Sequence, residues 1–295
     1  MIPITMRTSL RFPLSTATGL AFAWLLVACP VGMFAQNTHK NPTSKFYVAD
    51  LEGQSSLDTG TQVEDLKDKS VHSADGSTIE TNPKSKSAVV LSNGTGVFID
   101  PDTRMEVKRF MQEPFTPNRN DPEVEPSLSQ TQASIPHGTV GLCTPKMVAG
   151  STMVYDTPQA SIAIRGRKVV IGTDGDQTTV SLLEGDVTVR GDQYTGGQTL
   201  KPGQQAIITR SSPTAPPKIV IQQIPPDQMK ALTDRVTQAC VARLQVFFQS
   251  VDPKNLSPES VFTQDDPTQQ LVPKEIVPPT ISPTYTVSPY FIPKP

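Results

Sequence analysis

Charged residues are scarce in this chain of 295 residues, and cysteine and aromatic residues are scarcer still. Only 18% of the residues are Asp, Glu, Lys or Arg, and the net charge is −2. This balance gives no field that would recruit nucleic acid or an anionic membrane surface. Proline, in contrast, is abundant, with 29 residues. The composition therefore favours turn-rich β structure with Pro-rich segments over a helical enzyme.

The N-terminus has the pattern of a secretory signal peptide. Arg7 and Arg11 precede an apolar run, Leu20–Ala28, that is short for a membrane span. Two alternatives stay open: Cys29 follows Leu-Val-Ala as in a bacterial lipobox and would be lipidated, or the run stays uncleaved as an anchor. Each alternative predicts a bacterial protein exported to the periplasm or the cell surface. The membrane is expected as a partner only through such a lipid or anchor.

Cleavage of this leader would remove Cys29 and leave two of the three cysteines, Cys143 and Cys240. An even pair in an oxidising compartment is a candidate disulfide, and two buried free thiols are the alternative. Closing a loop of about 100 residues would stabilise the fold by roughly 4–5 kcal/mol.

Turn signals and apolar alternation predict β structure over most of the chain. Asn93-Gly94 is a hairpin signal after an expected strand, Ser87–Leu91, and short strands are expected at 133–135 and 139–142. The charged segment Thr61–Ser70 is predicted as a turn or one short helix. The fold class is therefore all-β, an antiparallel β-sandwich or β-roll, with one C-terminal helix and a Pro-rich tail.

Near residue 225 the period of the apolar residues changes to that of a helix. Apolar side chains recur every three or four residues and predict one buried helix face: Met229, Leu232, Val236, Cys240, Leu244 and Phe247. The expected division of the chain is signal peptide 1–35, disordered linker 36–45, β-domain 46–224, packed helix 225–250 and extended tail 251–295.

Patterns that would carry chemistry are weak. The histidines have no His or Cys neighbour at metal-ligand spacing, and no nucleophile elbow or phosphate loop occurs. We therefore expect no catalytic residue, metal or cofactor. The densest basic cluster is Arg165, Arg167 and Lys168, in which the arginines would share one face and bind a carboxylate or phosphate. An ordinary solvated turn is the alternative.

Three separated elements carry a family resemblance. They are Thr157–Gly166 (TPQASIAIRG), Leu183–Val189 (LEGDVTV) and Leu200–Ala206 (LKPGQQA). In order and spacing they resemble the FecR-type periplasmic domain over roughly residues 70–210. The resemblance implies a role in cell-surface signalling, in which FecR-like proteins couple an outer-membrane receptor to a sigma factor.

Only about 18 residues precede the apolar run, too few for the sigma-binding segment of such regulators. We therefore expect a stand-alone exported FecR domain: a non-enzymatic binding or scaffold module whose partner is an envelope protein or a cell-surface polymer. The contact is expected at an open sheet edge, where strands recruit peptides, or at the turn near Arg165. The alternative function is a FecR-like signalling regulator of an envelope or iron-uptake response that acts through a membrane partner.

Overall fold

A computed structural model describes residues 44–115, 121–165, 167–191, 196–212, 215–251 and 286–291, which all belong to one compact unit, 39–295. The expected signal peptide 1–35, with Cys29 as its alternative lipidation site, lies outside the described residues. So do most of the expected linker 36–45 and most of the expected tail 251–295. Among the described residues, no helix is long and apolar enough to cross a membrane.

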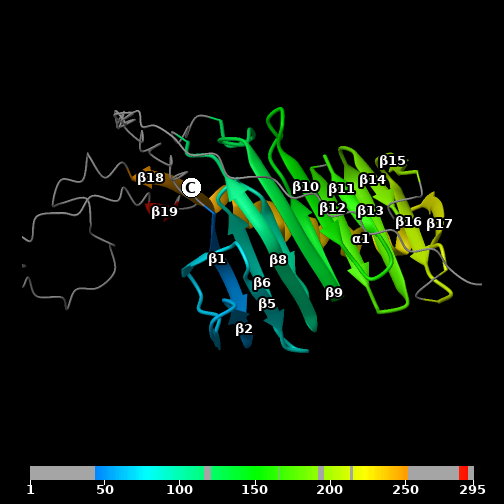
Figure 1. Ribbon diagram of the computed structural model, residues 1–295, viewed down its shortest axis with the longest axis horizontal. Helices are drawn as coiled ribbons and strands as arrows, with labels where there is room; N and C mark the ends of the chain where they lie inside the picture. The colour runs from blue at the N-terminus through cyan, green and yellow to red at the C-terminus, as the bar shows by residue number, and fades with distance from the viewer. Residues whose placement is uncertain are drawn as a thin grey trace, which may run out of the picture. The chain divides into compact units, whose positions relative to one another are not determined.

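Seventeen strands form one hydrogen-bonded network, which divides into two sheets that share the strand β9 (Ser129–Cys143) (Figure 1). Sheet 1 contains, in spatial order, β4 (Val71–Ser73), β1 (Lys45–Glu52), β6 (Lys86–Leu91), β7 (Gly96–Ile99), β9, β12 (Lys168–Thr173), β13 (Gln177–Glu184), β16 (Gln204–Thr209) and β17 (Lys218–Gln223). Sheet 2 contains β3 (Val63–Asp65), β2 (Ser55–Asp58), β5 (Thr78–Thr81), β8 (Thr103–Gln112), β9, β10 (Thr152–Asp156), β11 (Ser161–Ile164), β14 (Val187–Arg190) and β15 (Gln198–Leu200).

Strand β9 passes from one sheet to the other along its length. Its first part pairs with β8 and, in parallel, with β10, whereas Gly138–Cys143 pairs with β12 in sheet 1. Pro136, which cannot donate a backbone hydrogen bond, lies where the strand changes sheets. The sequence predicts two short strands here, but the structure has one. The remaining pairings between named strands are antiparallel, as the predicted fold class requires.

The two sheets face each other across one apolar core. Alternate residues of each strand point inward, so that Phe46 and Ile171 of sheet 1 join Met105 and Ile162 of sheet 2 in a single buried cluster. The architecture is therefore the β-sandwich that the apolar alternation predicts.

The helix α1 (Pro226–Gln245) crosses the outer face of sheet 1, where it contacts β1, β6, β7, β9 and β12 (Figure 1). Its buried side chains are mainly small, including Ala239 and Ala242. Of the predicted helix face, Val236 is buried, but Met229 and Leu244 are exposed. The helix backbone lies too close to the sheet for longer side chains: a Cβ on Gly96 would come within 2.1 Å of a carbonyl oxygen of α1.

Two predicted boundaries differ from the structure. Within Thr61–Ser70, residues Val63–Asp65 form strand β3 instead of a helix, because β2 offers them a pairing edge. The helix predicted over 225–250 ends at Gln245, and β18 (Val246–Val251) follows and pairs with β19 (Thr286–Phe291). The run Val246-Phe247-Phe248 has the β-branched and aromatic character of a strand.

Candidate functional site

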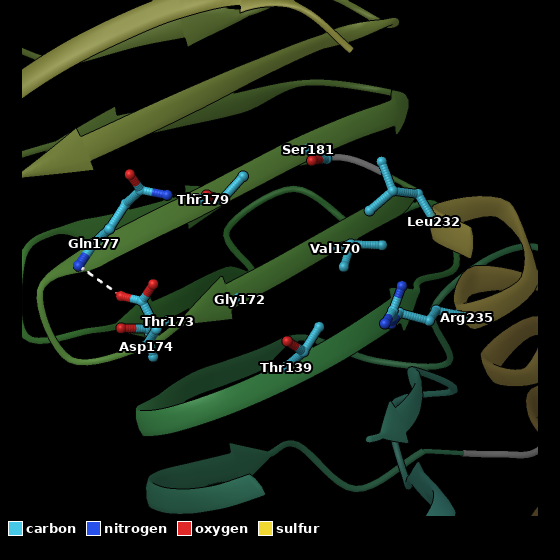
Figure 2. Close-up of a pocket in the computed structure, with 10 residues that line it drawn as sticks. All are labelled: Thr139, Val170, Gly172, Thr173, Asp174, Gln177, Thr179, Ser181, Leu232 and Arg235. Carbon is cyan, nitrogen blue, oxygen red and sulfur yellow. Dashed lines mark hydrogen bonds between the residues drawn. The ribbon is translucent and has the colours of Figure 1, made fainter. Parts of the chain in front are cut away.

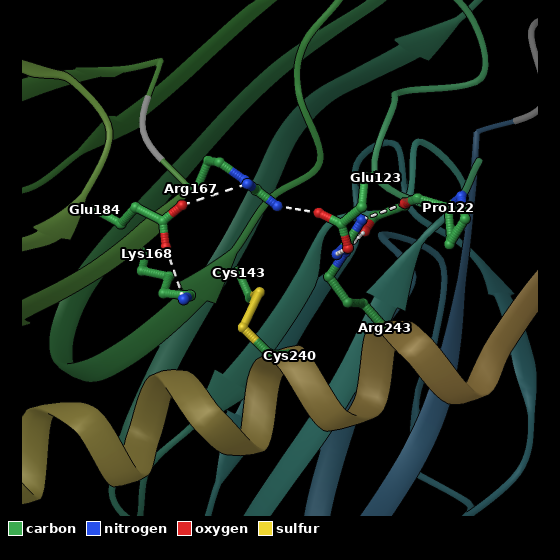
Figure 3. The surroundings of a disulfide bond; sticks show 9 residues. Pro122, Glu123, Cys143, Arg167, Lys168, Glu184, Cys240 and Arg243 are labelled. Carbon is green, nitrogen blue, oxygen red and sulfur yellow. Dashed lines mark hydrogen bonds and ion pairs between the residues drawn. A yellow bond between two sulfur atoms is a disulfide. The ribbon is translucent and has the colours of Figure 1, made fainter.

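A disulfide anchors α1 to the centre of the sandwich. It joins Cys143 at the end of β9 to Cys240 on α1, 97 residues apart in the sequence (Figure 3). Cys143 is buried beneath the helix. Two glycines allow the helix to pack this closely on the sheet. A Cβ on Gly141 would press on the backbone of Arg235, and a Cβ on Gly96 would press on the backbone of Ala239. The predicted cysteine pair is therefore bonded, and it fixes the helix over β7 and β9.

Beside the disulfide, five side chains of alternating charge form a row that we call the charge ladder: Lys168, Glu184, Arg167, Glu123 and Arg243 (Figure 3). Lys168 Nζ lies 2.7 Å from Glu184, and Arg167 Nη1 lies 3.3 Å from the same carboxylate. Arg167 also pairs with Glu123, which accepts a bond from Arg243 at 3.2 Å. The ladder thus ties the β11–β12 turn and the Glu123 loop to α1.

In the predicted basic site, two of the three cations form ion pairs within the chain. Arg167 and Lys168 are held by carboxylates of the same chain, and the hydrogen bond from Lys168 lowers the pKa of Glu184. Arg165 is exposed beside them, and its amide donates to the carbonyl of Asp186 at 2.9 Å. The arginines lie in the turn between β11 and β12, not on one face of an extended strand. An external anion would therefore compete with Glu184 and Glu123 for two of the three cations.

The sequence gives no indication of the role of Arg243. Its side chain is only 4% exposed and donates through Nε to the Gly94 carbonyl at 3.0 Å, besides its bond to Glu123. Burial lowers the pKa of Arg243, and the charge of Glu123 opposes that effect. Because the partners of Arg243 lie more than 100 residues away in sequence, no local pattern could have predicted this contact.

The Thr-Pro-Gln-Ala element makes a tight turn before β11, in which the Thr157 amide donates to the Ala160 carbonyl at 2.8 Å. Its Gln159 is buried and accepts a hydrogen bond from Thr178 at 2.6 Å. Gln159 also donates to the carbonyl of Gly175 in the β12–β13 turn. The element therefore locks two neighbouring turns together, which is a structural role.

A polar cavity of about 270 Å³ lies beside α1 on the outer face of sheet 1 (Figure 2). Leu232 and Arg235 project from the helix on one side, and the floor carries the hydroxyls of Thr139, Thr179 and Ser181. A second cavity of about 340 Å³ shares Arg235 and continues along the helix over Phe98 and Lys86. We call the two cavities together the α1 groove.

Arg235 divides the α1 groove and is fixed there. Its Nε lies 2.5 Å from Asp100 Oδ2, and the Asp100 side chain is only 15% exposed. The groove offers hydroxyls, an amide and both signs of charge, but no cluster of three carboxylates or metal ligands is found among the described residues. Such a lining suits hydrogen bonding to a protein segment.

Residues 77–188 match the family described as FecR protein. The chain contains a FecR domain. This match confirms the predicted resemblance, and it spans most of sheet 2 and the β6, β7, β9, β12 and β13 strands of sheet 1. The charge ladder residues Glu123, Arg167, Lys168 and Glu184 belong to the FecR domain, whereas α1 and Arg243 follow it in sequence.

Two crystal structures of a candidate anti-sigma factor from Parabacteroides distasonis are similar to this chain. Each is 17% identical and covers 53% of this chain, with TM-scores of 0.38 and 0.37. The alignments cover 63% and 64% of that protein, so this chain spans less than two thirds of its length. No curated protein matches the chain.

Proposed function

We propose that this chain is a non-enzymatic signalling regulator of the FecR type, which works outside the cytoplasm by binding a protein partner. The FecR domain over residues 77–188 is the observation that carries this proposal. The Cys143–Cys240 disulfide supports a place outside the cytoplasm, because such bonds persist in oxidising compartments. The signal-like pattern of residues 1–35 supports the same location.

We place the partner contact at the α1 groove. Arg167 and Lys168 are already paired with carboxylates, which weakens the case for the basic turn as the contact. The groove combines an apolar wall at Leu232 with hydroxyl groups and the Arg235 guanidinium. A partner segment there would bury apolar surface and satisfy its own polar groups, as protein interfaces do.

The test compares transcripts in the encoding organism with the gene deleted, and again after complementation. A regulator changes a defined set of transcripts, and wild-type protein restores them. Thr179→Arg, which fills the groove floor, should fail to restore them. Thr188→Arg is the matched control, because Thr188 is another half-buried strand threonine, on β14 of sheet 2.

The transcripts also separate the two functions. If deletion leaves transcripts unchanged while the protein still captures an envelope partner, signalling is refuted and the binding or scaffold function takes its place. If Thr179→Arg and Thr188→Arg restore the transcripts equally, the regulator does not use the groove.

A further inference from the structure

Strand β17 differs from every other edge of the two described sheets. Sheet 1 ends at β4 and β17, and sheet 2 ends at β3 and β15. The strands β3, β4 and β15 have three residues each, whereas β17 has six. Short strands protect a sheet edge from further pairing, and a long regular strand does not. The sequence of β17, KIVIQQ, contains no proline, and its pairing with β16 has no bulge.

The backbone of β17 presents a regular row of hydrogen-bonding groups at this edge. The Ile224 amide donates to the Gly203 carbonyl, which sets the phase of the ladder between β16 and β17. Because these groups alternate in direction along a strand, the amides and carbonyls of Ile219, Ile221 and Gln223 point away from β16. The side chains of Ile219 and Ile221 pack against the core, whereas Val220 and Gln222 are exposed, Val220 by 42%.

We propose that a second copy of this chain pairs with β17 edge to edge, in an antiparallel arrangement about a two-fold axis. The row is self-complementary: with Ile221 on the axis, Ile219 meets Gln223 of the second copy, and about six backbone hydrogen bonds form. Lys218, the only charged residue of β17, then faces Ile224 of the second copy, so no like charges meet. Sheet 1 becomes continuous across the two copies.

The surface area that this contact buries limits the affinity of the dimer. One strand edge buries less surface than the interfaces of stable dimers, so the association is reversible and depends on protein concentration. Sedimentation equilibrium of the purified full-length protein, from roughly 5 to 500 µM, should show a monomer–dimer transition. A monomer over this whole range overturns the proposal, and it leaves the edge to a strand of a different protein.

Proline variants test whether the edge itself makes the contact. Gln223→Pro removes an edge-directed amide at an exposed position and should raise the dimer dissociation constant by at least about tenfold. Ile221→Pro should abolish the dimer, and Ile221→Ala, which loses side-chain packing but keeps the amide, should retain it. An unchanged dissociation constant in a folded Gln223→Pro protein refutes an edge contact.

Cysteine cross-linking tests the register. In the proposed arrangement Val220 lies opposite Gln222 of the second copy, in a non-hydrogen-bonded pair with Cα atoms about 4.5 Å apart. Equal amounts of V220C and Q222C, mixed and oxidised mildly, should therefore give a disulfide-linked dimer on a non-reducing gel. Each variant alone should not, because its own cysteines would lie more than about 7 Å apart. Cross-linking of either variant alone as efficient as that of the mixture refutes this register.

Discussion

Removal of the Cys143–Cys240 disulfide should lower the stability of this fold by several kcal/mol. The bond closes a loop of 97 residues that includes the second half of β structure and most of α1. For a loop of about 100 residues, the chain-entropy model assigns about 4.7 kcal/mol to the constraint on the unfolded chain. Measured losses for native disulfides are roughly 2–5 kcal/mol, so we expect Cys143→Ala with Cys240→Ala to lower the free energy of unfolding by about 4 kcal/mol.

Urea unfolding followed by circular dichroism measures this loss. With a slope of about 3 kcal/mol per molar urea, the unfolding midpoint of the double variant should fall by about 1.3 M. The wild-type protein in reductant should show the same fall, and reductant should leave the double variant unchanged. Because the backbone of α1 packs directly on Gly96 and Gly141, we expect the helical and β-sheet circular dichroism signals to be lost in the same transition.

A fall of less than about 0.3 M would refute the reasoning. Such a result would mean that the unfolded chain is already restricted between these two positions, so that the bond removes little of its conformational freedom. A large fall in the double variant without any effect of reductant on the wild type would instead show that packing of the sulfur atoms, not the closed loop, carries the stability.

Three further changes test the packing and the charges. Gly96→Ala should destabilise the fold by about 1–3 kcal/mol, because the new methyl group would overlap a carbonyl of α1. Gly196→Ala, with open space around it, should change the stability little. Equal shifts of the thermal unfolding midpoint in the two variants would contradict close packing of α1 on Gly96. Burial lowers the pKa of His72, so the unfolded chain binds a proton at this side chain more readily than the folded chain does. The contribution of His72 to the free energy of unfolding should therefore be fully present above about pH 6.5 and should decrease as the pH falls below that value. His72→Gln should flatten this pH dependence. Glu123→Gln should cost about 1–2 kcal/mol in chemical unfolding, since it removes the charge partner of the buried Arg243; a cost near zero would show that the backbone carbonyls alone satisfy that guanidinium.

Local signals account for the parts of the fold that the sequence predicts. The strand before Asn93-Gly94 pairs with the strand after it, because the turn residues themselves impose the reversal. The helical period after Pro225 and the even pair of cysteines likewise depend on spacing that can be read along the chain. The FecR elements are recognisable because their turns need particular residues, such as Gly185, which has a positive φ of 98°.

Contacts between distant segments account for what the sequence does not predict. Arg167 meets Glu123 across 44 residues, so a cluster that reads as three free cations is largely neutralised in the fold. Strand β9 reads as two strands because Pro136 and Gly138 interrupt its apolar pattern, and only the neighbouring strands show that it is continuous. The helix ends at Gln245, where β18 begins, and the strand that pairs with β18, β19, lies in a distant segment of the chain.

The shared strand β9 has a mechanical consequence. Strands β1–β8 pair among themselves, β10–β17 do the same, and in the described part of the chain every ladder that joins these halves includes β9. The backbone hydrogen bonds alone would therefore allow the two halves to move relative to each other, with β9 as the hinge. Helix α1 crosses β9, contacts β6 and β7 on one side of it and β12 on the other, and is linked to β9 by the disulfide. Reduction would remove the covalent link between α1 and β9, so that only the non-covalent contacts of α1 would oppose this movement, while each half would keep its own hydrogen bonds.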